Sequence, residues 1–444
     1  MTIDLPLIAI IGRPNVGKST LFNRVAGARL AIVHNEPGVT RDRFFASAEF
    51  NRRSFLLVDT AGITLGKRES QLEQDTERQA LLALESADLV WLVLDGRDGC
   101  TGVDEKILQR LRRRSQPPFM VVVNKVDDPG QAAATVADFY RLGVANLYAV
   151  SGEHNRGVDV LLGASLDCIK APKQKKMAKP VDCTLALIGR PNSGKSSLLN
   201  ALVGHERAVV SAAAGTTRDT IHELLRHGGK TIRIADTAGL RRKPRITSSL
   251  EYYSTVRALK AIAEADVCAL LLDPTQDTAE QEKRLARTVW DEGKGLIYVV
   301  SKKDVFENTQ QQDRHQVAAT DFIHFLPGVP LLHVSSQDRQ GLRPLLETTL
   351  RVARNRHQHV PTGPLVRWAR SLSIGNLRIM YAAQEKNTVP PTFHFFCSDP
   401  GQLQRGDKLR SLEHRLRDGF SGFNGVPLRI FIHGKNLAEA RKTA

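Results

Sequence analysis

The stretch G-R-P-N-V-G-K-S, residues 12–19, decides the fold class of this chain. It fits the pattern G-x-x-x-x-G-K-[ST], in which glycines let backbone N–H groups curl around phosphate oxygens at the N-terminus of a helix. An apolar run, residues 6–11, precedes it. We therefore expect a strand, a phosphate loop and a helix, with Lys18 reaching the terminal phosphates and Ser19 binding magnesium.

The pattern occurs twice. G-R-P-N-S-G-K-S returns at residues 189–196, after an offset of 177 positions. The same offset maps three further motifs onto one another: T-R-D at 40–42 and 217–219, D-T-A-G at 59–62 and 236–239, and N-K-V-D at 124–127 with S-K-K-D at 301–304. This repeat predicts two copies of one domain.

Each copy alternates continuous apolar runs with helical patterns, which is typical of a mostly parallel sheet covered by helices on both faces. The expected class is α/β, as two tandem P-loop domains. After about residue 354 the repeat ends, and strand-like T-F-H-F-F-C, a helical stretch at 402–420 and strand-like P-L-R-I-F-I predict a small α+β domain. The expected boundaries are 1–168 for the first domain, 169–180 for a lysine-rich linker, 181–354 for the second domain and 355–444 for the third.

The base is read away from the phosphates, because a phosphate loop alone does not separate ATP from GTP. In N-K-V-D the Asp127 carboxylate can accept from N1 and N2 of guanine, a pair of donors that adenine does not offer. Asn124 can tie the base to the phosphate loop, and the stem of Lys125 can lie over the ring. The motif alone is equally compatible with a solvated turn, but its order behind the other motifs favours GTP and disfavours ATP.

Two further motifs form the expected switch. Asp59 would lie near magnesium through water, the Gly62 amide near the γ-phosphate, and Thr40 would bind magnesium only while that phosphate is present. Their counterparts in the second copy are Asp236, Gly239 and Thr217. Some GTPases place a water-orienting glutamine after D-T-A-G, but this chain has Ile63 and Leu240. Hydrolysis should therefore be slow unless a cation, a partner or another side chain stabilises the developing charge.

The second copy departs from the first at its base-reading motif, where Ser301 replaces asparagine. Serine keeps one hydroxyl but loses the reach and the paired donors of the amide, while Asp304 can still read guanine. We expect weaker or less selective nucleotide binding there.

These motifs resemble the tandem GTPases called Der or EngA, also described as double-Era-like GTPases. Further matches are P-G-V-T-R-D-R from residue 37, G-L-R-R-K and E-Y-Y-S-T-V-R within 239–257, P-P-T-F-H-F-F at 390–396, and the stretch 416–430. The resemblance covers nearly the whole chain and implies a KH-like third domain. It also implies that GTP hydrolysis to GDP and phosphate is coupled to assembly of the large subunit of the bacterial ribosome, with the subunit or its precursor and rRNA as partners.

The resemblance further implies that Asn15 and Asn192, inside the phosphate loops, hold an activating potassium ion. This chain departs from the family pattern at Gly152 and Ser336, where alanine is common, and in its lysine-rich linker. The string G-F-N-G at 422–425 fits the G-x-x-G of nucleic-acid-binding KH modules, but it joins a helix to a strand, which favours a plain turn.

The candidate site residues follow from these motifs. The catalytic candidates are Lys18, Thr40, Gly62, Lys195, Thr217 and Gly239. The magnesium candidates are Ser19, Thr40, Asp59, Ser196, Thr217 and Asp236. The nucleotide-binding candidates of the first copy are Gly12, Arg13, Pro14, Asn15, Val16, Gly17, Lys18, Ser19, Thr20, Asp59, Thr60, Ala61, Gly62, Ile63, Asn124, Lys125, Val126, Asp127, Ser151 and Gly152. Those of the second copy are Gly189, Arg190, Pro191, Asn192, Ser193, Gly194, Lys195, Ser196, Ser197, Asp236, Thr237, Ala238, Gly239, Leu240, Ser301, Lys302, Lys303, Asp304, Ser335 and Ser336.

Charge points to a polyanionic partner. The chain holds 63 Lys and Arg against 47 Asp and Glu, a net charge of +16. Residues 1–167 have 20 basic against 21 acidic side chains, whereas residues 355–444 have 14 against 6. RNA is therefore expected to face the linker, the second P-loop domain and the third domain rather than the first.

Two functions of different classes remain open at this point. The first is a GTPase switch in maturation of the large subunit. The alternative is an RNA-binding assembly scaffold whose second P-loop domain binds nucleotide with little hydrolysis. The five cysteines lie far apart, and no run of about 18 apolar residues occurs. We expect a monomeric, cytoplasmic protein without a membrane span.

Overall fold

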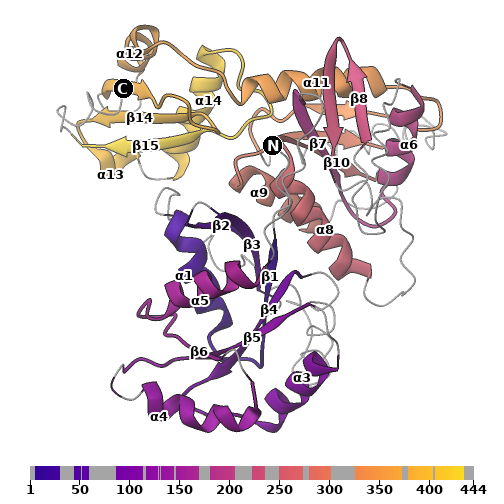
Figure 1. Cartoon of the computed structure of the whole chain (residues 1–444). Coiled ribbons are helices and arrows are strands. Elements are labelled where there is room, and N and C mark those ends of the chain that lie inside the picture. The colour runs from indigo at the N-terminus through magenta and orange to yellow at the C-terminus, as the bar shows by residue number, and fades with distance from the viewer. Residues whose placement is uncertain are drawn as a thin grey trace. The chain divides into compact units, whose positions relative to one another are not determined.

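The computed structural model describes residues 6–30, 45–51, 53–59, 87–113, 117–128, 130, 132–144, 147–169, 181–205, 223–235, 250–273, 280–301, 326–372, 379–403 and 406–434. Contacts between Cα atoms divide the chain into two compact units. One holds residues 1–177 with 246–263, and the other holds 178–245 with 264–444 (Figure 1). None of the helices in the described ranges is long and apolar enough to cross a membrane.

The first unit is built on a six-stranded sheet. The strand order is β2 (Phe45–Phe50), β3 (Arg53–Asp59), β1 (Leu7–Ile11), β4 (Leu89–Asp95), β5 (Phe119–Asn124) and β6 (Leu147–Ala149). Neighbours run parallel except for the β2–β3 pair. The helical elements are α1 (Lys18–Leu30), α3 (Gly102–Arg112), α4 (Ala132–Ala137), the 3-10 helix η3 (Asp138–Leu142) and α5 (Val158–Cys168).

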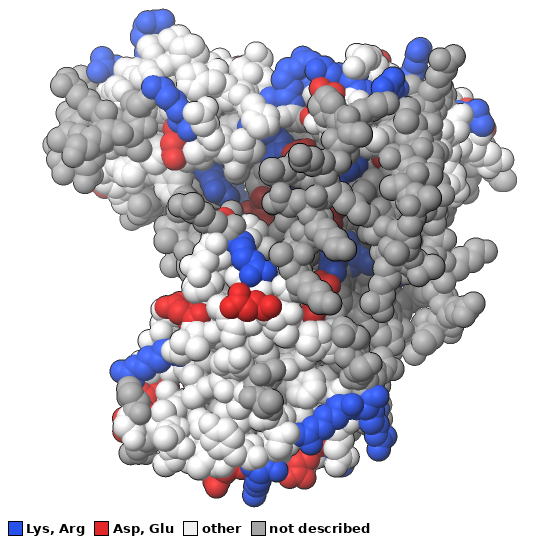
Figure 2. Space-filling model, viewed as in Figure 1, with Lys and Arg blue, Asp and Glu red and all other residues white. Residues whose placement is uncertain are grey.

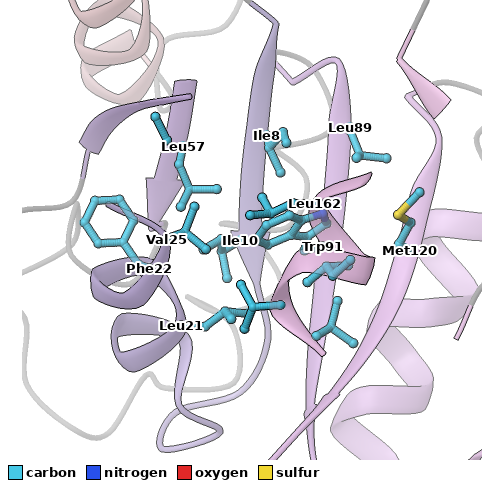
Figure 3. Packing of buried hydrophobic residues seen from close by; sticks show 14 of the residues in the cluster. Ile8, Ile10, Leu21, Phe22, Val25, Leu57, Leu89, Trp91, Met120 and Leu162 are labelled. Atoms are coloured by element: carbon cyan, nitrogen blue, oxygen red, sulfur yellow. The ribbon is translucent and has the colours of Figure 1, made fainter. Parts of the chain in front are cut away.

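Both faces of this sheet are buried, as the continuous apolar runs predict. On one face Trp91 of β4 packs among side chains of the sheet, α1 and α5, including Leu21, Phe22 and Leu162 (Figure 3). The indole Nε1–H of Trp91 donates to Ser165 Oγ at 2.9 Å, so its one polar atom is paired inside the core. The other face packs against α3, α4 and η3. Because β3, β1, β4, β5 and β6 run parallel, their carboxyl ends lie at one edge of this buried sheet.

The second unit repeats this sheet. Its order is β8 (Glu223–His227), β9 (Lys230–Ile234), β7 (Cys183–Ile188), β10 (Val267–Leu272), β11 (Gly295–Val300) and β12 (Leu331–His333). The β8–β9 pair is again the antiparallel one. Its helices before the C-terminal part are α6 (Lys195–His205), α9 (Glu280–Asp291) and α11 (Leu342–Asn355), whereas α8 (Leu250–Glu264) groups with the first unit up to residue 263. The two copies of one α/β domain are therefore confirmed.

A three-stranded sheet forms the C-terminal part of the second unit. It consists of β13 (Ile379–Gln384), β14 (Thr392–Cys397) and β15 (Arg429–His433), with β13 antiparallel and β15 parallel to β14. The helices are α12 (Thr362–Ser371), α13 (Pro400–Leu403) and α14 (Gly406–Gly419). The expected α+β class is confirmed. The predicted helical stretch becomes two helices, and the sequence reasoning missed α12 and β13.

The turn after α14 joins this small sheet to the P-loop domain of the same unit. Gly425 accepts from the backbone N–H of Leu296 in β11 and donates to Gly328 O, both at 2.8 Å. Asn355 Nδ2 at the end of α11 donates to Asn424 O at 2.9 Å, and Val426 is buried in the core of the P-loop domain. The G-F-N-G string is thus a turn that is hydrogen-bonded to β11, in agreement with its position between a helix and a strand.

Replacement of Gly425 tests this contact. Its φ is +76°, and a Cβ there would lie 2.7 Å from a methyl of Val352 and 3.0 Å from Leu296 O. We expect Gly425→Ala to lower the free energy of unfolding of the second unit by about 2 kcal/mol or more. Gly228→Ala is the matched control, because Gly228 has a φ of +56° but open space around it, and it should cost only about 1 kcal/mol of backbone strain. Equal losses in thermal unfolding would contradict the packing role.

Candidate functional sites

The first phosphate loop runs from the end of β1 into α1. Gly12 and Gly17 have φ of +148° and +86°. A Cβ on Gly12 would lie 2.4 Å from Val93 O, and one on Gly17 would lie 2.3 Å from Asn124 Nδ2. Neither position has room for a side chain. The loop therefore packs closely against the ends of β4 and β5 and leads into the N-terminus of α1.

Lys18 is buried within this loop. Its ammonium donates to Gly12 O at 2.8 Å and to Arg13 O at 2.7 Å. Burial lowers the pKa of Lys18 to about 8, although the carboxylates of Asp59 and Asp104 act to raise it. A desolvated cation held by two carbonyl groups is suited to exchange these contacts for phosphate oxygens.

Ser19 and Asp59 form the expected magnesium pair. Ser19 Oγ donates to Asp59 Oδ2 at 2.6 Å, across the junction of α1 and β3. Hydroxyl and carboxylate oxygens are the ligands that magnesium prefers, so the two residues present fit this ion. Asn15 is exposed on the loop with a φ of +66°. Thr40 and residues 60–63 lie outside the described residues.

The base-reading motif follows β5. Asn124 Nδ2 donates to Val16 O at 2.9 Å, and Asn124 Oδ1 accepts from Gly152 N at 3.0 Å. Asp127 Oδ1 accepts from Ser151 Oγ at 2.6 Å, and its Oδ2 pairs with Arg97 Nη2 at 2.5 Å. The hydrogen bond from Ser151 and then the pair with Arg97 lower the pKa of Asp127. Its carboxylate is therefore ionised at neutral pH, which is the state that accepts from guanine.

Some of the residues that position this site were missed by sequence reasoning. Lys125 Nζ pairs with Asp95 Oδ2 at 2.6 Å. Burial acts to raise the pKa of Asp95, but the Lys125 ammonium and two backbone N–H groups hold it below its usual value. Arg97 lies in the same turn after β4. The only signal available was the position of D-G-R-D directly after a buried strand.

Each phosphate loop also has a buried acidic anchor. Arg13 Nε lies 3.5 Å from Asp104 Oδ2 in the first turn of α3, and Arg190 Nε lies 2.7 Å from Glu282 Oε1 in the first turn of α9. Asp104 and Glu282 are almost fully buried. Both arginines are nucleotide-binding candidates, and in this structure their side chains contact these two acids.

The second phosphate loop repeats the first. Lys195 Nζ donates to Gly189 O at 2.8 Å and to Arg190 O, and burial lowers the pKa of Lys195 to about 8. Gly189 and Gly194 again have positive φ. Ser301 Oγ lies 2.9 Å from Ser193 O. Asn192 is exposed.

Several candidates of the second copy lie outside the described residues. They are Thr217, residues 236–240 and residues 302–304.

Comparisons with known proteins agree with this geometry. The family profile described as "50S ribosome-binding GTPase" matches residues 7–125 and 184–302, and that described as "KH-domain-like of EngA bacterial GTPase enzymes, C-terminal" matches residues 362–433. The protein called GTPase Der of Geobacillus thermodenitrificans is 40% identical over 96% of this chain and 98% of its own length. The chain belongs to the Der GTPase family.

Other family members cover the chain as completely. GTPase Der of Alkaliphilus oremlandii is 38% identical over 97% of this chain and 98% of its own. That of Gloeobacter violaceus is 38% identical over 100% and 99%. The chain is thus a GTPase with tandem P-loop domains and a KH-like C-terminal domain.

The buried lysine predicts a pH limit for nucleotide binding. Phosphates need Lys18 protonated, whereas the free site releases its proton near pH 8. Binding above this pH takes up a proton, so affinity should be level below about pH 8 and fall as the pH rises further. GDP titrations of the full-length Lys195→Ala chain, which isolates the first site, measure this.

A variant pair sharpens this test. Asp104→Asn keeps the acceptor oxygen but removes a charge that raises the pKa of Lys18, so the fall should begin at lower pH. Asp98→Asn is the control, because the exposed Asp98 pairs with Arg13 but is not among the groups that shift the pKa of Lys18. Affinity that stays level to pH 9, or the same onset in both variants, would contradict the account.

Proposed function

We propose that the chain is a GTP-driven switch in maturation of the large ribosomal subunit, with the subunit or its precursor and rRNA as partners. The observation that carries this proposal is the pairing of two phosphate loops, each centred on a buried lysine, with a strongly basic C-terminal part. The family membership supports the same function.

Nucleotide binding would change the partners of these site residues. The phosphates would draw the ammonium of Lys18 from its carbonyl partners. Guanine would donate to the Asp127 carboxylate in place of Arg97, while Ser151 stays bonded to it. Magnesium, when bound, neutralises phosphate charge, and Ser19 with Asp59 would hold it. Thr40 and Gly62 are proposed to report the γ-phosphate, with Thr217 and Gly239 in the same role in the second copy.

A monovalent cation is proposed to supply the charge that a glutamine supplies elsewhere. Ile63 and Leu240 have no group that orients water, whereas Asn15 and Asn192 present amide oxygens from exposed loop positions. A fixed positive charge there would stabilise the transition state. We expect faster GTP turnover in potassium than in sodium buffer at matched ionic strength, and this advantage should shrink in Asn15→Ala. Equal turnover in the two salts would refute the cation site.

Basic residues of the KH-like domain are proposed to face RNA. In Figure 2, Lys and Arg side chains gather over α11 at the end of the second P-loop domain, and further ones are scattered near α12 of the KH-like domain. Arg367 on α12 and Arg410 on α14 are exposed. We expect the double variant Arg367→Glu/Arg410→Glu to weaken binding to large subunits and to reduce its salt dependence, because fewer phosphates are neutralised.

Cosedimentation with purified subunits under GDP, GTP and a non-hydrolysable GTP analogue tests this proposal. Lys106→Glu/Arg113→Glu on the neutral first domain is the matched control, since it makes the same charge change at exposed positions and should leave the salt slope intact. Absence from the large-subunit fraction in every nucleotide state would refute the ribosomal role. An unchanged salt slope in the KH-like variant would refute only the assignment of the surface.

A further inference from the structure

The two sites differ in how the base-contact turn is attached to the phosphate loop. In the first site the amide of Asn124 joins three segments, because it belongs to β5, donates to Val16 O and accepts from Gly152 N. Asn124 is almost fully buried. A base bound against the turn at Ser151 and Gly152 would therefore be connected, through the Asn124 side chain, to the loop that binds its phosphates.

Ser301 keeps only part of this connection. Its hydroxyl lies 2.9 Å from Ser193 O and 3.1 Å from Leu272 O, and one proton serves both acceptors. No hydrogen bond joins Ser301 to Ser336, the counterpart of Gly152, within the described part of the chain. A Cβ on Gly194 would lie 3.7 Å from Ser301, whereas one on Gly17 would lie 2.3 Å from the Asn124 amide. Among the described residues, nothing takes the place of the amide next to Gly194 in the second site.

A second difference lies in the turn itself. The turn has the same form in both copies, since the backbone N–H groups of His154 and Asp338 bond the hydroxyls of Ser151 and Ser335 at 3.1 and 3.0 Å. The Ser151 hydroxyl donates to the base-reading carboxylate of Asp127 at 2.6 Å. The Ser335 hydroxyl lies 3.1 Å from Asp338 Oδ2. Because a hydroxyl has one proton, Asp338 competes for it with any carboxylate that reads the base.

We propose that Ser301 and Asp338 make the second site less selective for the base, and faster in releasing bound nucleotide, than the first site. This inference rests on the proposed nucleotide binding at both loops. The second site holds a nucleoside diphosphate chiefly by its phosphates, through Lys195 and the loop amides. Loss of one buried hydrogen bond and weakening of another should make GDP leave it about tenfold faster than the first site, with a smaller preference for GDP over IDP, which lacks the 2-amino donor.

Full-length variants isolate each site for the test. Lys18→Ala leaves the second site to be read, and Lys195→Ala leaves the first. The measurements are release of a fluorescent GDP and its competition by IDP. In the Lys18→Ala background, Ser301→Asn and Asp338→His should each slow release several-fold and raise the preference for GDP. In the Lys195→Ala background, Asn124→Ser should speed release, which gives an independent reading if a second-site variant fails to fold.

Gln337→Ala is the matched control, because Gln337 is an exposed residue of the same turn, and it should change neither quantity. Equal release rates and equal base preference at the two sites would overturn the inference. So would second-site variants that fold but leave both quantities unchanged while Asn124→Ser has no effect. Failure of the unmodified chain to bind GDP at all would instead refute the proposed nucleotide function.

Discussion

A buried ammonium group held by backbone carbonyls is the interaction on which both sites depend. Lys18 and Lys195 each lie inside a loop that leaves a fully buried strand, and each donates to the carbonyls of the first two loop residues. Removing a cation from water is costly, and this cost appears as the lowered pKa of both lysines. The fold tolerates this cost because a bound phosphate would stabilise the protonated, charged form of the lysine. Glycines with positive φ, parallel strands and a helix N-terminus are the scaffold that holds the ammonium in place.

The acidic anchors extend this scaffold to the next helix. Asp104 and Glu282 each lie in the first turn of the helix that follows β4 or β10, and each contacts the arginine of its phosphate loop. One copy uses aspartate and the other glutamate at the same place. Because both copies place a buried acid against the loop arginine, we infer that this contact is part of the site.

Local patterns in the sequence encode much of the fold and of the first site. The buried strands of both sheets, the phosphate loops and Asn124 with Asp127 follow from apolar runs and motif order, so their positions could be predicted. The edge strands β2 and β8 were missed, since F-A-S-A-E-F and E-L-L-R-H have little apolar continuity. Three residues were missed because each reaches the site from a turn or helix that follows a different strand: Arg97, Asp104 and Asp338. The docking of residues 424–426 on β11 depends on a contact between distant segments that no spacing reveals.

Two lysine-centred GTPase sites are predicted in one chain, so the most direct test counts them. Equilibrium binding of a non-hydrolysable GTP analogue at saturation should give two bound nucleotides per chain in the unmodified protein, one in Lys18→Ala, one in Lys195→Ala and none in the double variant. Saturation ensures that the weaker binding proposed for the second site does not lower this number. Two bound nucleotides in either single variant, or one in the double variant, would contradict the claim that each buried lysine serves a site of its own.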